Sequence, residues 1–306
     1  LGNGKNIVEI AGGNNTIVLG ENEDTVNITG GINFIEAGDG KDTITATSGT
    51  NTIHAGTGND TVTTGNGNDI IYSDDYDGDK EDNDTLKGGD GYDKYYVGNG
   101  DTIEDSDGDG NVWFKNSYPL SGGIETNPGS KVYKGSGYTY HLDGDELKVV
   151  HDSTKESITI RNFNQEKNSL GITLINKVGL KIKDVTKNES DKTAEITIEL
   201  VGEITGDGSL DVFMRNSSDK AITFKKGDTI KTYKYDISDY DDFIVNTQKI
   251  RDAASLTPYR IAPIGVDYDS YSSEFGHLKI KDDDSPLKLF LKSSSTSEAS
   301  EKLYTI

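Results

Sequence analysis

An acidic or amide side chain recurs at every ninth residue through the first third of the chain, close to a glycine. Residues 1–72 divide into eight contiguous nonapeptides, in which position 6 is Asp or Asn and position 4 is Gly in seven of the eight. After a six-residue insertion at 73–78, the pattern resumes with Asp84 and Asp93 at position 6, and a shortened unit at 97–104 follows with Asp101 in the corresponding place. Carboxylate oxygens are ligands for hard cations, so cation binding is the chemistry that this spacing favours.

The charge of the chain is concentrated in the same segment. Residues 1–112 hold 23 acidic and five basic side chains, whereas residues 113–306 hold 30 acidic and 26 basic ones. Such an excess of negative charge repels itself and needs counterions, and it excludes nucleic acid as a partner. The chain has no Cys, which excludes disulfides and thiolate metal sites. No apolar run approaches the roughly 20 residues of a membrane-spanning helix.

The elements that must position these side chains follow from the same period. Position 8 is always Val or Ile in the first eight units, from Val8 to Ile71. We expect positions 1–6 to form a turn in which Gly tolerates positive φ, and positions 7–9 to form a short strand with position 8 pointing inward.

This repeat resembles that of the repeats-in-toxin (haemolysin-type calcium-binding) family, G-G-x-G-x-D-x-(aliphatic)-x, which the run from Gly88 to Asp93 matches best. The resemblance implies a parallel β-roll over residues 1–112, in which two nonapeptides make one turn and the strands stack about 4.8 Å apart. It also implies Ca²⁺ between stacked loops, held by backbone carbonyls and position-6 Asp. The residues that it implies for the metal sites are Asp24, Asp42, Asp60, Asp69, Asp84, Asp93, Asp101, Asp105, Asp107, Asp109, Gly38, Gly40, Gly56, Gly58, Gly65, Gly67, Gly89, Gly91 and Asp90.

The two edges of such a roll differ. We define the odd edge by the position-6 residues Asn6, Asp24, Asp42, Asp60, Asp84 and Asp101, and the even edge by Asn15, Asn33, Asn51, Asp69 and Asp93. Asn is neutral, so we expect calcium mainly on the odd edge of the first three turns. There the even-edge Asn side chains should hydrogen-bond to backbone and to each other; the alternative is that they are plain turn residues.

Two acidic segments lie near the end of the repeats. The acidic segment 73–84, which includes the insertion, contains Asp74, Asp75, Asp77, Asp79, Glu81, Asp82 and Asp84, and it is either a solvated acidic loop or an extra cation site. The segment 105–110 resembles the start of an EF-hand loop. Its twelfth position is Asn116 and no helix pattern flanks it, so we interpret it as the last even-edge loop, stacked under Asp93.

Residues 113–176 read as a β cap, since a solenoid needs its open end covered. The segments Ser157–Phe163 and Leu170–Leu174 resemble the cap that follows calcium repeats in secreted iron-regulated and lipase-like bacterial proteins. We expect Trp113 and Phe114 to begin this cover as core residues. His54, at position 9, should lie on the surface.

A further all-β domain is expected at 177–286. Ala221–Ile237 and Gly276–Asp284 resemble a Calx-β domain, an immunoglobulin-like sandwich. In that family the Asp triplet, here 282–284, can bind calcium together with a loop near Asp241 and Asp242 and with a Glu that Glu189 matches; a solvated interdomain loop is the alternative. Residues 287–306 begin another module or form an export signal.

Catalysis finds no support in the sequence. The four His residues are scattered, and there is no G-x-S-x-G, H-E-x-x-H or phosphate-loop motif. The expectation is an all-β, non-enzymatic segment of a secreted protein exported by a type I system. It belongs either to a large adhesin or surface-layer protein, with contacts to a cell surface or a neighbouring subunit, or to the calcium-folded tail of a secreted protease, lipase or pore-former whose active domain lies upstream.

Overall fold

The computed structural model describes residues 1–73, 82–115, 118–188, 190–214, 221–237, 250–255, 258, 260–264, 266–268, 273–275, 277–281, 288–290 and 303–305. The chain forms two compact units, Leu1–Lys177 and Val178–Ile306. In the part of the chain that the structure describes, the regular elements of both units are β-strands, apart from two short 3-10 helices in the first unit. The all-β fold class predicted from the sequence is confirmed.

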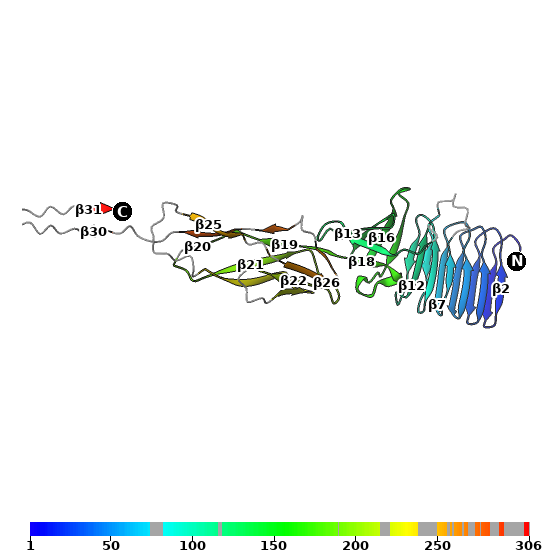
Figure 1. Cartoon of the computed structure of the whole chain (residues 1–306). Coiled ribbons are helices and arrows are strands. Elements are labelled where there is room, and N and C mark those ends of the chain that lie inside the picture. Colours follow the sequence, from blue (N-terminus) through cyan, green and yellow to red (C-terminus); the bar gives the residue numbers. More distant parts are fainter. Residues whose placement is uncertain are drawn as a thin grey trace, which may run out of the picture. The chain divides into compact units, whose positions relative to one another are not determined.

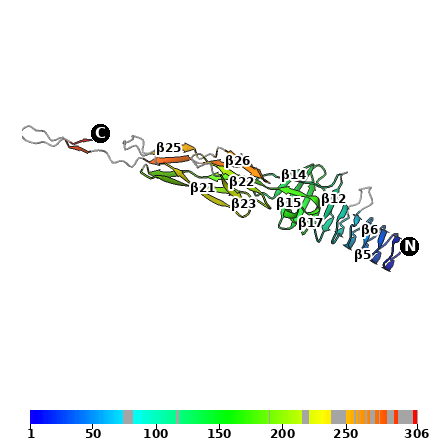
Figure 2. The same ribbon diagram turned by 60° about the horizontal axis from the view of Figure 1, so that its bottom comes forward.

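The nonapeptides form a roll of two parallel sheets, whose coils stack from the blue N-terminal end to β12 (Figures 1 and 2). The odd units give β1 (Ile7–Ala11), β3 (Thr25–Thr29), β5 (Thr43–Ser48), β7 (Thr61–Asn66), β9 (Thr85–Lys87) and β11 (Thr102–Glu104). The even units give β2 (Asn15–Val18), β4 (Ile32–Glu36), β6 (Thr50–His54), β8 (Ile70–Tyr72), β10 (Asp93–Val97) and β12 (Gly110–Phe114). Each strand therefore pairs with the strand two units later, as the two-repeat turn predicts.

Side chains at two positions of the repeat point into the core of the roll, at position 8 and at position 1 of the following repeat. The position-8 side chains from Val26 to Val112 are at most 1% exposed. Position 1 also points inward, because the strands run on past position 9 into the next unit. It carries Leu19 and Ile28, then the small residues Ala37, Ala46, Ala55, Thr64 and Ser73, all buried. The predicted strand of three residues is confirmed for β8, β9 and β11, whereas the other strands of the roll have four to six residues. The core is also wider than position 8 alone.

A row of aromatic rings lies on the outer face of the even sheet. The rings of His54 and Tyr72 stack with centroids 4.3 Å apart, those of Tyr72 and Tyr96 at 4.4 Å, and those of Tyr96 and Trp113 at 4.8 Å. The expectation that Phe114 belongs to the core is confirmed, since it is 0% exposed. The same expectation for Trp113 is wrong, because Trp113 is only half-buried. Trp113 pairs in register with Tyr96, and both side chains lie on the outward face of the even sheet.

The cap continues the odd sheet. Strand β17 (Ser157–Arg161) pairs in parallel with β11, and four antiparallel neighbours follow in the order β16 (Glu146–His151), β15 (Tyr138–Asp143), β14 (Val132–Gly135) and β13 (Gly122–Glu125). Strand β18 (Thr173–Ile175) pairs with β13. The 3-10 helices η1 (Gln165–Lys167) and η2 (Ser169–Gly171) lie between β17 and β18.

The second unit contains further sheets around its own apolar core. One sheet has the order β24 (Ile230–Asp236), β21 (Thr193–Val201), β19 (Lys177–Ile182) and β27 (Asp267–Tyr268), with β28 (Glu274–Phe275) also on β19. A second sheet has the order β20 (Val185–Asn188), β29 (His277–Lys281) and β25 (Ile250–Ser255). A third sheet has the order β23 (Ile222–Lys225), β22 (Ser209–Phe213) and β26 (Arg260–Ile264). A hairpin pairs β30 (Lys288–Phe290) with β31 (Leu303–Thr305). Buried residues such as Ile196, Leu210 and Phe224 form the core.

Candidate cation-binding edges

The loops on each edge stack so closely that position 4 must be glycine in most coils. A Cβ added to Gly58 would collide with the carbonyl oxygen of Gly40, one coil away, and Gly91 has the same relationship to Gly67. Gly58 also has φ = +124°, which L side chains rarely adopt. These glycines bring the backbone carbonyls of successive loops into register along each edge.

A ladder of backbone-to-carboxylate hydrogen bonds runs along the odd edge. The backbone N–H of each position-6 residue donates to Oδ1 of the position-6 Asp in the next coil. The donor–acceptor distances are 2.6 Å for Asn6–Asp24, 2.7 Å for Asp24–Asp42, 2.7 Å for Asp42–Asp60, 2.7 Å for Asp60–Asp84 and 3.0 Å for Asp84–Asp101. One oxygen of each carboxylate is thereby fixed, and the ladder continues across the insertion and the shortened unit.

The second carboxylate oxygen, Oδ2, is buried without a hydrogen-bond partner in several position-6 Asp residues of both edges. Among the described residues this holds for Oδ2 of Asp24, Asp42, Asp60, Asp69 and Asp93. Burial raises the pKa of Asp60 and Asp93 to about 7, and it also raises the pKa of Asp42 and Asp69. A buried charge without a partner is costly, so each of these oxygens needs a proton or a cation.

The even edge begins with a neutral ladder. The side-chain amide of Asn15 donates to Oδ1 of Asn33 at 2.8 Å, and that of Asn33 donates to Oδ1 of Asn51 at 2.8 Å. Asn33 also donates to the Gly30 carbonyl oxygen at 3.1 Å. The predicted hydrogen bonding of Asn side chains to backbone and to each other is confirmed. From Asp69 onward the ladder is charged, with the Asp69 N–H donating to Asp93 Oδ1 at 2.8 Å.

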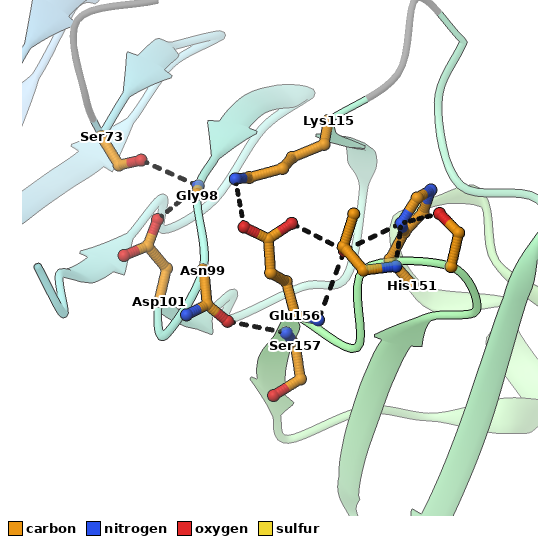
Figure 3. Close-up of polar contacts among 10 residues, drawn as sticks. Ser73, Gly98, Asn99, Asp101, Lys115, His151, Glu156 and Ser157 are labelled. Carbon is orange, nitrogen blue, oxygen red and sulfur yellow. Dashed lines mark hydrogen bonds and ion pairs between the residues drawn. The ribbon is translucent and has the colours of Figure 1, made fainter. Parts of the chain in front are cut away.

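The odd edge ends in a carboxylate that protein donors satisfy (Figure 3). Oδ1 of Asp101 accepts from the Asp84 N–H, and Oδ2 accepts from the Gly98 N–H at 2.8 Å. Gly98 N–H is also 3.2 Å from Ser73 Oγ. Gly98 and Asp101 lie three residues apart within the shortened unit 97–104. Asp101 was predicted as a metal ligand from its position, and the geometry gives it an alternative role as the last link of the ladder.

The segment 105–110 is the last even-edge loop and stacks on the loop of Asp93, whose N–H donates to the Asp109 carbonyl oxygen at 3.2 Å. The register partner of Asp93 is Gly110, so no carboxylate follows it at position 6. Both oxygens of Asp105 are occupied, Oδ2 by the Tyr95 hydroxyl at 2.6 Å and Oδ1 by the Gly108 N–H at 2.7 Å.

The remaining acidic residues of this edge lie nearer its surface. Oδ2 of Asp107 accepts from the Gly91 N–H at 2.9 Å, and its Oδ1 accepts from the Asp109 N–H at 2.9 Å. The exposed Asp90 accepts from the Ser106 hydroxyl at 2.6 Å. Asp109 is exposed. The structure thus gathers Asp90, Asp105, Asp107 and Asp109 at one end of the even edge, but only Asp93 presents a buried oxygen without a partner.

The cap forms hydrogen bonds with the last coil on both edges, in the place where a further coil would form them. Gly100 N–H donates to the Ser157 carbonyl oxygen at 2.9 Å, and Ser157 N–H donates to Oδ1 of Asn99 at 2.9 Å (Figure 3). Lys115 and Glu156 form an ion pair at 2.6 Å in the same region. On the even edge Leu170 N–H donates to the Gly108 carbonyl oxygen at 2.7 Å. The last coil therefore has partners for its backbone groups.

Sequence reasoning missed two kinds of residue on these edges. Position-5 Asn side chains form a second ladder, in which Asn59 Oδ1 accepts from the Asn83 N–H and Asn68 Oδ1 accepts from the Tyr92 N–H. The frequent Asn before the position-6 Asp was the available signal. The second is Asp82, which was noted only as part of the acidic insertion and which is buried at 7% exposure.

The donor set fits Ca²⁺. The described residues contain no cluster of three or more Asp, Glu or His side chains that could hold a metal by themselves, so an ion on these edges needs backbone carbonyls in addition to carboxylates. Stacked loops with aligned carbonyls and buried carboxylate oxygens supply such hard ligands. The acidic residues 74, 75, 77, 79 and 81, Asn116, Glu189, Asp241, Asp242 and the triplet 282–284 lie outside the described residues.

No helix among the described residues is long and apolar enough to cross a membrane. No curated protein matches the chain. The family model of the RTX calcium-binding nonapeptide repeat matches in four copies, at residues 27–61, 45–75 and 80–104. Repeats of this family bind calcium and are typical of proteins secreted by type I systems, so residues 27–75 and 80–104 of the roll are RTX calcium-binding repeats.

Proposed function

We propose that this chain is a calcium-dependent folding segment of a large secreted bacterial surface protein of the adhesin or surface-layer type. The observation that carries the proposal is the row of buried carboxylates that each keep one oxygen without a protein partner. In this proposal the ligands are Asp24, Asp42 and Asp60 on the odd edge and Asp69 and Asp93 on the even edge. Carbonyls of loops that contain Gly38, Gly40, Gly56, Gly58, Gly65, Gly67, Gly89 and Gly91 complete the sites.

The energetics of a single coil favour this assignment. Ordering the backbone costs roughly 1–2 kcal/mol per residue, whereas one fully buried aliphatic side chain returns roughly 1.5–3 kcal/mol. Each nonapeptide buries one such residue at position 8 and, from Ala37 to Ser73, only a small one at position 1. Ion binding then becomes folding energy, because no site exists in the unfolded chain. The protein would remain extended at low calcium, and export through a type I system would precede folding.

The second candidate function is that of the calcium-folded tail of a secreted enzyme or toxin. The separate core of Val178–Ile306, with its several sheets, supports the surface-protein proposal, because tandem β modules are typical of adhesins. We propose that this unit is Calx-β-like. The sequence of the full gene product distinguishes the two, since more β modules favour the first and an upstream catalytic motif favours the second.

The calcium proposal is tested by circular dichroism of the chain in chelator and in millimolar calcium. The expected result is a loss of β signal and of Trp113 fluorescence anisotropy in chelator, with recovery when calcium is added back. Magnesium at the same concentration is the control, because it dehydrates reluctantly and demands octahedral geometry. An unchanged β spectrum and melting temperature in chelator would contradict the proposal.

A further inference from the structure

Asp82 occupies position 4 of its coil, where the neighbouring odd-edge loops have Gly40 and Gly58. Its side chain is buried, with 7% of its surface exposed. Oδ2 accepts a hydrogen bond from the Gly58 backbone N–H at 2.6 Å. Oδ1 is buried and has no hydrogen-bond partner among the described residues. A carboxylate has thus been placed inside the stack of loops with one oxygen still unsatisfied.

The surroundings of Asp82 bring a second unsatisfied carboxylate close to it. Residues 82–84 stack directly on residues 58–60, because the Asp60 N–H donates to Asp84 Oδ1 at 2.7 Å and the Asn83 N–H donates to Asn59 Oδ1 at 2.8 Å. Asp60 is 1% exposed, and its Oδ2 has no partner among the described residues. The charge of Asp82 contributes, after burial and the nearer Asp42, to the raised pKa of Asp60.

The site is enclosed from the other side by the next coil. A Cβ on Gly100 would lie 3.2 Å from the Asp82 carbonyl oxygen. Within the described residues neither Asp60 nor Asp82 forms an ion pair, and neither carboxylate is open to water. Two charged oxygens in such a place repel each other and have lost their hydration. A cation between them would remove both costs.

We propose that Asp60 and Asp82 together hold one Ca²⁺ between the fourth and fifth odd-edge loops, at a site with one more carboxylate than the other odd-edge sites. The inference rests on the proposed calcium function and adds to it a rank order among the ions. Calcium affinity in oxygen sites rises with the number of charged ligands and with rigidity. This ion therefore binds first as calcium rises and leaves last when a chelator is added.

The experiment compares the full chain with Asp82→Asn, Asp82→Gly and the matched control Asp39→Asn. Asp82→Asn removes the charge and keeps the shape, Asp82→Gly restores the usual residue, and Asp39 is an exposed acidic residue of the same edge. Calcium is titrated in competition with a chelating dye, and release from the saturated protein is followed by stopped flow. We expect one ion per chain with an affinity at least about tenfold above the rest, which is about 1.4 kcal/mol.

That tight ion should disappear into the weaker class in both Asp82 variants and persist in Asp39→Asn. Circular dichroism at saturating calcium checks that each variant is folded, and Asp82→Gly keeps the test decisive if Asp82→Asn folds poorly. A wild-type chain without a tighter ion, or Asp82 variants that retain it, would overturn the inference while leaving calcium-dependent folding intact. A chain that binds no calcium at all would instead overturn the proposed function.

Discussion

Asn51 donates twice to one oxygen of Asp69, through its backbone N–H at 2.7 Å and through its side-chain amide at 2.9 Å. These bonds join the neutral ladder of the first even-edge loops to the charged ladder of the later ones. On the neutral side the donors are the side-chain amides of Asn15 and Asn33, whereas on the charged side the donor is the Asp69 backbone N–H. On both sides the acceptor is Oδ1 of the next position-6 residue, and that residue changes from a neutral amide to a carboxylate. The two halves of the even edge therefore share a fold but differ in their need for cations.

This difference predicts unequal effects of matched substitutions on calcium affinity. Asp42→Ala removes a buried carboxylate whose Oδ2 has no protein partner, whereas Asn33→Ala removes an amide whose partners are other Asn side chains and backbone. The calcium midpoint of folding, followed by the fluorescence of the single Trp113, should rise at least about tenfold for Asp42→Ala. It should rise much less for Asn33→Ala, and equal shifts would show that the edges do not differ.

A pH dependence of the calcium-free chain follows from the raised carboxylate pKa values. Burial, followed by nearby carboxylates, raises the pKa of Asp60 and Asp93 to about 7, from 3.8. Burial likewise raises the pKa of Asp105 to about 6. Between these values and 3.8 the folded state binds more protons than the unfolded state, so its stability falls as pH rises from about 4 to about 7.

In chelator we therefore expect more β signal and a higher urea midpoint at pH 4.5 than at pH 8. With calcium present the direction reverses, because protons and calcium compete for the same oxygens, and more calcium should be needed for folding at pH 5 than at pH 8. Titrations at the two pH values, with and without calcium, measure both effects. A calcium-free chain that is more stable at pH 8 would contradict the role assigned to these carboxylates.

Loop stacking gives a prediction with an internal control. Gly58→Ala adds a Cβ that collides with the Gly40 carbonyl oxygen at a φ of +124°, whereas a Cβ at Gly4, with φ = +131°, meets nothing within 4 Å. Both substitutions carry backbone strain, but only the first disrupts stacking. We expect Gly58→Ala to cost about 1–3 kcal/mol more than Gly4→Ala in urea unfolding at saturating calcium. Equal losses would mean that strain, and not contact between loops, dominates.

The sequence predicted the repeating part of this fold well, because a nine-residue period fixes which side chains turn inward and which oxygens line an edge. It could not show that Asp101 and Asp105 accept two protein hydrogen bonds each, since the donors Gly98 and Tyr95 become neighbours only through a shortened unit and a buried ring. The burial of Asp82 could not be predicted for a related reason. An Asp within an acidic segment is expected to be solvated, and only the stacking of the loops shows that it is buried.

The hydrogen bonds between the cap and the last coil predict that folding of the roll depends more on its C-terminal end than on its N-terminal end. Strand β17 extends the odd sheet beyond β11, and the Thr159 N–H donates to the Asp101 carbonyl oxygen at 2.9 Å. Without these bonds the last coil would fray. A chain of residues 1–112 should need several-fold more calcium to fold than one of residues 1–177, by circular dichroism, whereas a chain of residues 37–177 should stay close to the latter. If the 37–177 chain proved the more calcium-demanding, the cap would not be the nucleus.

The insertion before Asp82 leaves the register of the roll unchanged. Thr61 pairs with Thr85 in the same way that Thr43 pairs with Thr61, although the first pair is separated by six more residues in the chain. Register is thus set by the position-6 ladder and not by the length of the connecting segment. An edge loop of this molecule can therefore accept a grafted peptide and display it at a fixed point, while the strands on either side keep their partners.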